Sequence, residues 1–140
     1  LRNLSKESRE AMMKKIETIS NGIAESMGEA VIGIRAGYAA VYNDEKFSDF
    51  VAATFRKYED IIHEDLGDGK PEDWLITGEH PLLGAVGFGF YSQKAPSCMI
   101  WVGVGGNSPK HSPGFCIDER YIKLCTRAMA MTALEYLTKE

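Results

Sequence analysis

A continuous apolar run, CMIWVGV at residues 98–104, restricts the fold of this chain more than any other feature of its sequence. The run has the length of a β-strand, and its apolar side chains do not alternate with polar ones. Because a strand with one face in water would alternate, this pattern predicts a strand that is covered on both faces. We therefore expect a central strand in a sheet flanked by helices.

Three segments have the apolar spacing of amphipathic helices. The first follows Ser5, a residue suited to cap a helix N-terminus, and ends at Gly28, which is typical of a helix stop. The second follows Asn43 and Asp44. The third follows Asp118 and is apolar nearly all round, so we expect it to be well buried. The apolar positions are Met12, Ile16, Ile19, Ile23 and Met27; Phe47, Phe50, Val51, Phe55 and Tyr58; and Ile122, Leu124, Cys125, Ala128, Met129, Met131, Leu134 and Leu137.

A second strand is predicted at residues 30–38, AVIGIRAGY, where apolar side chains alternate along one face. Residues 59–81 mix charges with Gly and Pro and show no sustained period. Helices and strands therefore follow one another in the order α-β-α-(β)-β-α. This order predicts an α/β (α+β) fold.

The composition excludes some classes of function. The 140 residues carry a net charge of −4 with both signs interspersed, so the chain lacks the basic surface that nucleic acids and anionic membranes attract. No apolar run reaches the roughly 18–20 residues of a membrane span. Cys98, Cys116 and Cys125 have no C-x-x-C spacing and predict reduced thiols. We expect a cytoplasmic protein with neither nucleic acid nor membrane as a partner.

Two places in the sequence could carry metal chemistry. His111 lies in a Gly/Pro/Ser loop, GGNSPKHSPGF, directly after the predicted central strand, and ligands gather at the carboxyl ends of strands in such sheets. A lone loop histidine is nevertheless more often a hydrogen-bonded or surface residue, and the spacing leaves both interpretations open. His63-Glu64-Asp65 contains an H-x-D pattern, but its charged, turn-rich surroundings favour a solvated surface.

The order of the motifs along the chain resembles that of one enzyme family. GGNSPKHSPGFCIDERYIKLCTRAMAMTALEYL contains a glycine-rich strand end, the pattern H-[SN]-P-x-F, the sequence I-D-E and a long Ala/Leu helix. Upstream, LRNLSKESREAMMKKIETISNGIAESMG and RAGYAAVYND are similar to a G-T-[LV]-R strand end with its helix and to an [RP]-G-Y-P-x-x-x-N-D return. These motifs resemble the zinc-dependent amidohydrolases and peptidases that include aminoacylases, hippurate and auxin-conjugate hydrolases, N-acyl-diaminopimelate deacetylases and carboxypeptidases.

The resemblance implies both a domain organisation and a site. Residues 1–41 would be part of an inserted lid and dimerisation domain, and residues 42–140 the C-terminal portion of the metal-binding catalytic domain. His111, the histidine of H-[SN]-P, would be a metal ligand, and Arg2 would bind a substrate carboxylate through its guanidinium. The complete enzyme would hold zinc or another divalent metal and hydrolyse N-acyl amino acids or small peptide amides.

The departures from the family pattern concern the metal site. The family's other ligands, an H-x-D or C-x-H segment, an adjacent Glu-Glu pair and a further histidine, have no counterpart in this chain, and one ligand does not make a metal site. The pattern G-[SA]-E-D-F aligns with residues 84–88, where Val86 and Gly87 replace the acidic pair. We expect this chain alone to be inactive, and whether it binds any metal stays open.

The chain begins at Leu1, only a few residues before a strong helix signal, and we expect it to be cut from something longer. A lid without its first strand would have an unpaired edge, which favours association, so we expect homo-oligomers. A non-catalytic oligomerisation or interaction module is therefore the alternative function.

Overall fold

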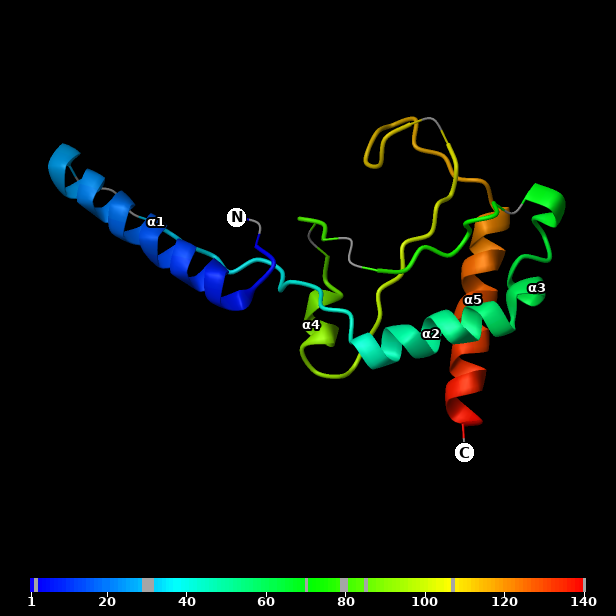
Figure 1. The fold of residues 1–140 in the computed structure, drawn as a ribbon. Helices are drawn as coiled ribbons and strands as arrows, with labels where there is room; N and C mark the ends of the chain where they lie inside the picture. The colour runs from blue at the N-terminus through cyan, green and yellow to red at the C-terminus, as the bar shows by residue number, and fades with distance from the viewer. Residues whose placement is uncertain are drawn as a thin grey trace. The chain divides into compact units, whose positions relative to one another are not determined.

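The computed structural model describes residues 1, 3–28, 32–69, 71–78, 81–84, 86–106 and 108–139, without the side chain of residue 68. The chain, drawn as a ribbon in Figure 1, divides into two compact units by the contacts among its residues. The first comprises Leu1–Asp44 and Glu79–Met99, and the second comprises Glu45–Gly78 and Ile100–Glu140. Each unit is described by itself.

The first unit is built around α1, Lys6–Met27, as the apolar spacing predicted. Ser5 caps the helix, because its side chain accepts a hydrogen bond from the backbone N–H of Ser8 at 3.1 Å. Gly28 ends it with a φ of 119°, a conformation that favours glycine. No residue of α1 is buried within the described part of the chain. The predicted helix is confirmed, and its apolar face lies open to solvent.

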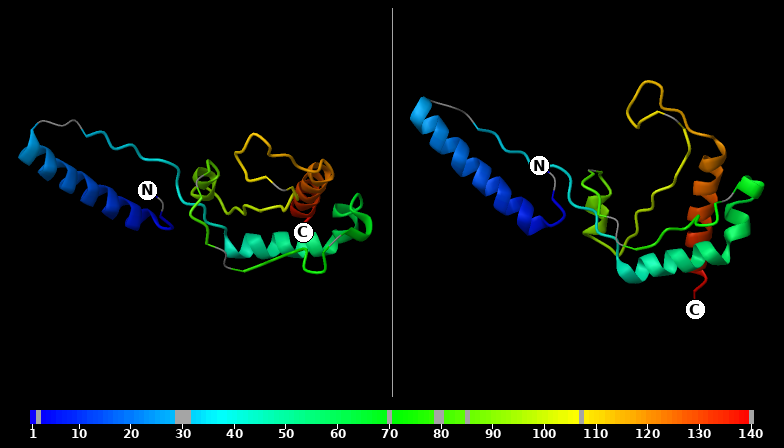
Figure 2. Two further views of the ribbon diagram at one scale, coloured as in Figure 1. Left: turned by 90° about the horizontal axis from the view of Figure 1, so that it is seen from above. Right: turned by 45° about the horizontal axis from the view of Figure 1, so that its top comes forward.

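After α1 the chain runs back in the opposite direction as an extended segment (Figure 2). Arg9 Nη1 donates to the carbonyl oxygen of Tyr38 at 2.6 Å and ties the helix to this segment. Farther along, the side-chain amide of Asn43 exchanges two hydrogen bonds with the backbone of Met99, at 2.9 and 3.0 Å. The short helix α4, Gly89–Ser92, lies against residues 39–42, and its Ser92 accepts from the backbone N–H of Tyr42.

The second unit is a small helical cluster. It contains α2 (Glu45–Lys57), α3 (Glu59–Ile62), the short 3-10 helix η1 (Gly67–Gly69) and α5 (Arg120–Leu137). Helix α2 crosses α5 in both figures, and α3 also packs against α5. The core of this unit is formed by side chains from the three α-helices. Its buried residues are Val51, Thr54, Phe55, Ile62, His63 and Ala128.

Ion pairs join the helices of the second unit at their surface. Glu135 on α5 accepts hydrogen bonds from Lys57 Nζ at 2.7 Å and from Tyr58 Oη at 2.8 Å, and these bonds hold the pKa of its carboxyl below the usual range. Arg127 on α5 binds Asp65 at 2.6 Å and Glu64 at 2.8 Å, just after α3. These ion pairs therefore join α5 to the rest of the unit near its middle, at Arg127, and near its C-terminus, at Glu135.

The expected sheet flanked by helices is wrong: within the described residues, the structure has helices and extended segments but no strand. Residues 32–38 are extended and mostly exposed, and the division between the two units falls inside the apolar run 98–104, after Met99. A strand is stabilised by hydrogen bonds to a second strand. The apolar pattern indicates that a segment can enter a sheet, but it supplies no pairing partner.

The expected burial of the last helix is also wrong. Helix α5 begins after Asp118, whose side chain accepts from the backbone N–H of Arg120 at 3.0 Å, but only Ala128 among its described residues is buried. Its large apolar side chains Met129 and Leu137 are 72% and 81% exposed.

Among the described helices, none combines the length and hydropathy that crossing a membrane requires.

Candidate functional site

His111 lies at the turn of a loop in the second unit whose two ends approach each other closely. Gly106 and Cys116 form the neck of the loop. Gly106 has a φ of 88°, and a Cβ atom placed on it would lie only 2.8 Å from the carbonyl oxygen of Cys116. The absence of a side chain at position 106 therefore allows the two ends of the loop to meet.

The backbone of His111 itself is unusual. Its φ of 67° is the only positive value at a non-glycine residue within the described residues. The next residue is held in a turn, because both the N–H and the hydroxyl of Ser112 donate to the carbonyl oxygen of Pro109, at 3.2 and 2.8 Å. His111 is exposed. A left-handed conformation at a side chain with ligand chemistry is a feature found often at functional sites.

The residue before His111 is anchored by an aromatic ring. Lys110 Nζ lies 4.1 Å from the ring centroid of Trp101, in the extended segment that leads into the loop. This distance is well within the roughly 6 Å over which an ammonium is attracted to the face of an indole. Both side chains are largely exposed, so the contact stands at the surface.

In the part of the chain that the structure describes, His111 belongs to no cluster of three or more metal-ligating side chains. None of the described His, Cys, Asp and Glu side chains gather in groups of three that could hold a metal ion. Protein zinc sites use three or four such ligands. The described residues therefore do not form a metal site by themselves, and His111 as a metal ligand stays a prediction.

The H-x-D segment is structural rather than a ligand pair. His63 was expected at a solvated surface and is instead only 9% exposed, with its ring centroid 4.4 Å from that of Trp74. Its Nδ1 lies 3.0 Å from the carbonyl oxygen of Glu59, and Asp65 binds Arg127. Burial lowers the pKa of the His63 imidazole, because desolvation disfavours its charged form.

We expect the second unit to lose stability when the pH falls from 8 to 5. His63 has a lower pKa in the folded chain than the ordinary 6.5, so the unfolded chain binds more protons near that pH and is favoured by acid. Urea unfolding followed by far-UV circular dichroism at both pH values measures this loss. In His63→Gln, which cannot titrate, the loss should be smaller; an equal loss would assign it to the carboxylates.

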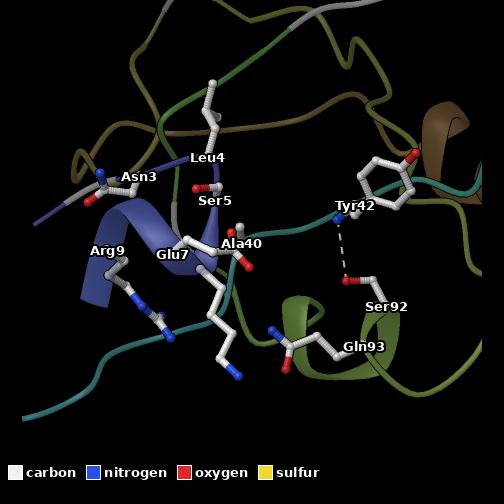
Figure 3. A pocket seen from close by; sticks show the side chains of 10 residues that line it. Asn3, Leu4, Ser5, Glu7, Arg9, Ala40, Tyr42, Ser92 and Gln93 are labelled. Carbon is white, nitrogen blue, oxygen red and sulfur yellow. Dashed lines mark hydrogen bonds between the residues drawn. The ribbon is translucent and has the colours of Figure 1, made fainter. Parts of the chain in front are cut away.

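Arg2, the predicted ligand of a substrate carboxylate, lies outside the described residues, so its role stays a prediction. Near it in sequence, the first unit contains a cavity of about 340 Å³ beside the N-terminus of α1 (Figure 3). Lys6 and Arg9 in its wall are accompanied by Glu7, so the cavity has mixed charge and identifies no ligand class.

Comparison with known proteins identifies the family. The chain is 32% identical over 114 residues to an N-acetyldiaminopimelate deacetylase of Oenococcus oeni, which covers 80% of this chain and 26% of that protein. It is 25% identical over 136 residues to an N-acetylcysteine deacetylase of Bacillus subtilis, and the match covers 96% of this chain and 32% of that protein. It is 36% identical over 69 residues to thermostable carboxypeptidase 2 of Saccharolobus solfataricus, covering 46% and 18%. The chain belongs to this amidohydrolase and peptidase family.

The family expected from the sequence motifs is therefore confirmed. This amidohydrolase-family chain spans between 26% and 31% of the length of two N-acetyldiaminopimelate deacetylases and one uncharacterized hydrolase that it matches. Neither a family model nor a solved structure matches the chain. The predicted boundary between residues 41 and 42, as a division between lid and catalytic domain, stays a prediction.

Proposed function

We propose that this chain is part of a metal-dependent amidohydrolase that cleaves N-acyl amino acids or small peptide amides. The carrying observation is the 32% identity to an N-acetyldiaminopimelate deacetylase, over a segment that contains the exposed, left-handed His111. The names of the relatives describe deacetylases and carboxypeptidases, which all hydrolyse an amide bond next to an amino acid. A cytoplasmic location is part of the same proposal.

His111 has the role of one metal ligand in this proposal, and Arg2 that of a substrate-carboxylate ligand. Zinc or another divalent ion would supply Lewis-acid activation of water and of the amide carbonyl. A neutral imidazole nitrogen is a suitable donor for such an ion. One donor is too few for a metal site, and the family's other ligands have no counterpart in this chain, so the proposal includes that the chain alone is inactive.

We expect the purified chain to retain well below one zinc ion per molecule after dialysis against trace zinc, and to release no acetate from N-acetyl amino acids. Elemental analysis and an acetate assay measure these quantities. One or two tightly held zinc ions per chain would contradict the proposed inactivity, because ligands beyond His111 would then complete the site.

The role of His111 is testable in a chimera where this chain replaces the corresponding segment of the Oenococcus oeni deacetylase. We expect His111→Ala to lower deacetylation at least about a hundredfold and to reduce the zinc content, because loss of a direct ligand should cost no less than loss of its supporting residues. Lys46→Ala, at an exposed position on α2, is the matched control. Unchanged zinc content in His111→Ala would rule out the ligand role.

The exposed face of α1 favours one alternative, a non-catalytic oligomerisation module. Five apolar side chains at helical spacing are between 41% and 84% exposed there: Met12, Ile16, Ile19, Ile23 and Met27. Burying such a stripe against a second copy would remove apolar surface from water. Sedimentation should then show a dimer or larger species that Ile19→Glu dissociates and Lys14→Glu, on the opposite face of α1, does not. A strict monomer at micromolar concentration would exclude this alternative.

A further inference from the structure

The loop that carries His111 is fixed on both sides of that residue. On one side, Lys110 Nζ lies 4.1 Å from the centroid of the Trp101 ring. On the other, Ser112 forms two hydrogen bonds to the carbonyl oxygen of Pro109. His111 stands between these anchors with a φ of 67°. A residue in this sparsely populated conformation persists only where its neighbours hold it there.

We propose that Trp101 and Lys110 form a clamp that positions His111. The two side chains come from residues nine positions apart in the sequence, on the segment that enters the loop and at its turn. Their attraction therefore joins the turn to the segment that precedes the loop, in addition to the contact between Gly106 and Cys116 at the neck. Both are positioning residues, because neither has an atom that would bind the metal in the proposed function.

The surroundings of the clamp argue against a packing role for Trp101. Its side chain is 59% exposed, and Lys110 is exposed as well, so neither contributes a buried surface to the core of the second unit. The indole of Trp101 therefore contributes a cation–π attraction to the ammonium of Lys110 rather than apolar packing in the core. The contact also gives the charged end of Lys110 a defined place, next in sequence to the histidine that would receive a divalent cation.

If the Trp101 ring were absent, the ammonium of Lys110 would be free to approach His111. It would then repel a divalent ion bound there. The clamp thus predicts different effects from its two halves. Removing Trp101 loosens the turn and releases the ammonium, whereas removing the charge of Lys110 only loosens the turn. The expected effect of the released ammonium on metal binding rests on the proposed metal-ligand role of His111. The positioning of the turn does not depend on that role.

The experiment uses the full 140-residue chain labelled with ¹⁵N. Variants are Trp101→Ala and Lys110→Ala, the conservative Trp101→Phe and Lys110→Arg, and Lys123→Ala as a control that removes an exposed lysine elsewhere in the unit. Backbone order parameters of residues 108–116 report the positioning. The response of the His111 ring to added Zn²⁺ reports the affinity, and far-UV circular dichroism confirms that the helices are intact.

We expect order parameters in the turn to fall from about 0.85 toward 0.6 in both alanine variants and to stay high in Trp101→Phe, Lys110→Arg and Lys123→Ala. Zn²⁺ affinity at His111 should fall about two- to fivefold in Trp101→Ala, the range of an exposed cation–π contact, and less in Lys110→Ala. Unchanged order in both alanine variants would overturn the clamp. Lowered order without any response of the wild-type His111 ring to Zn²⁺ would support the clamp, and the metal role is then tested separately by the zinc content of the chimera with His111→Ala.

Discussion

Replacing Phe55 by Ala should remove a large part of the stability of the second unit. Phe55 on α2 is 6% exposed, in a core whose described buried members are few. Truncating a buried Phe typically costs about 3–5 kcal/mol, because apolar contacts are lost and a cavity remains. Whole domains are stable by only about 5–15 kcal/mol. We therefore expect the urea midpoint of the helical far-UV signal to shift strongly downward.

The matched control for this variant is Leu137→Ala. Leu137 lies at the end of α5 and is 81% exposed, so its truncation should change the unfolding free energy by no more than about 0.5 kcal/mol. The comparison separates burial from the simple loss of apolar atoms. A cost below about 1 kcal/mol for Phe55→Ala would show that α2 does not pack through this side chain.

The sequence predicted the helices because their signals are local. Each of α1, α2 and α5 forms its backbone hydrogen bonds within one segment, and the apolar spacing and the residues Ser5 and Gly28 lie inside or next to that segment. The extent of burial is a different quantity. It depends on which other segments pack against the apolar face. The apolar pattern of α5 indicates only that such packing would be favourable.

The strands were predicted wrongly because the hydrogen bonds of a strand, unlike those of a helix, are not made within one segment. The run 98–104 has the composition of a buried strand, but its backbone partners must come from another segment. In the structure, Met99 instead exchanges hydrogen bonds with the side chain of Asn43. A side-chain amide can satisfy the same backbone groups as a neighbouring strand. Periodicity does not distinguish between these two kinds of partner.

The candidate site shows a similar division. His111 was identified through its motif, and spacing alone left it undecided. Its left-handed backbone and the contact between Trp101 and Lys110 depend on how the loop closes, which no local pattern specifies. The burial of His63 was missed because the residues around it are charged. Its cover is provided by Trp74, eleven positions downstream, together with its place at the end of α3.

The neck of the His111 loop gives the second large expected effect, in Gly106→Ala. An alanine at a φ of 88° is strained by about 1–2 kcal/mol, and its Cβ would lie 2.8 Å from the carbonyl oxygen of Cys116. That oxygen belongs to the backbone and has no rotamer by which to move away. Such overpacking costs a further 1–3 kcal/mol or so. We expect urea unfolding to show a total loss of about 2–5 kcal/mol.

Two neighbouring glycines separate the causes of this loss. Gly105 has a φ of 63° with open space around its Cβ position, so Gly105→Ala should show the backbone strain alone. Gly103 has open space and no positive φ, so Gly103→Ala should be nearly neutral. The expected order of destabilisation is therefore Gly106, Gly105, Gly103. Equal costs at positions 106 and 105 would mean that the loop ends do not meet at Cys116, because the steric contribution of the closed neck would then be absent.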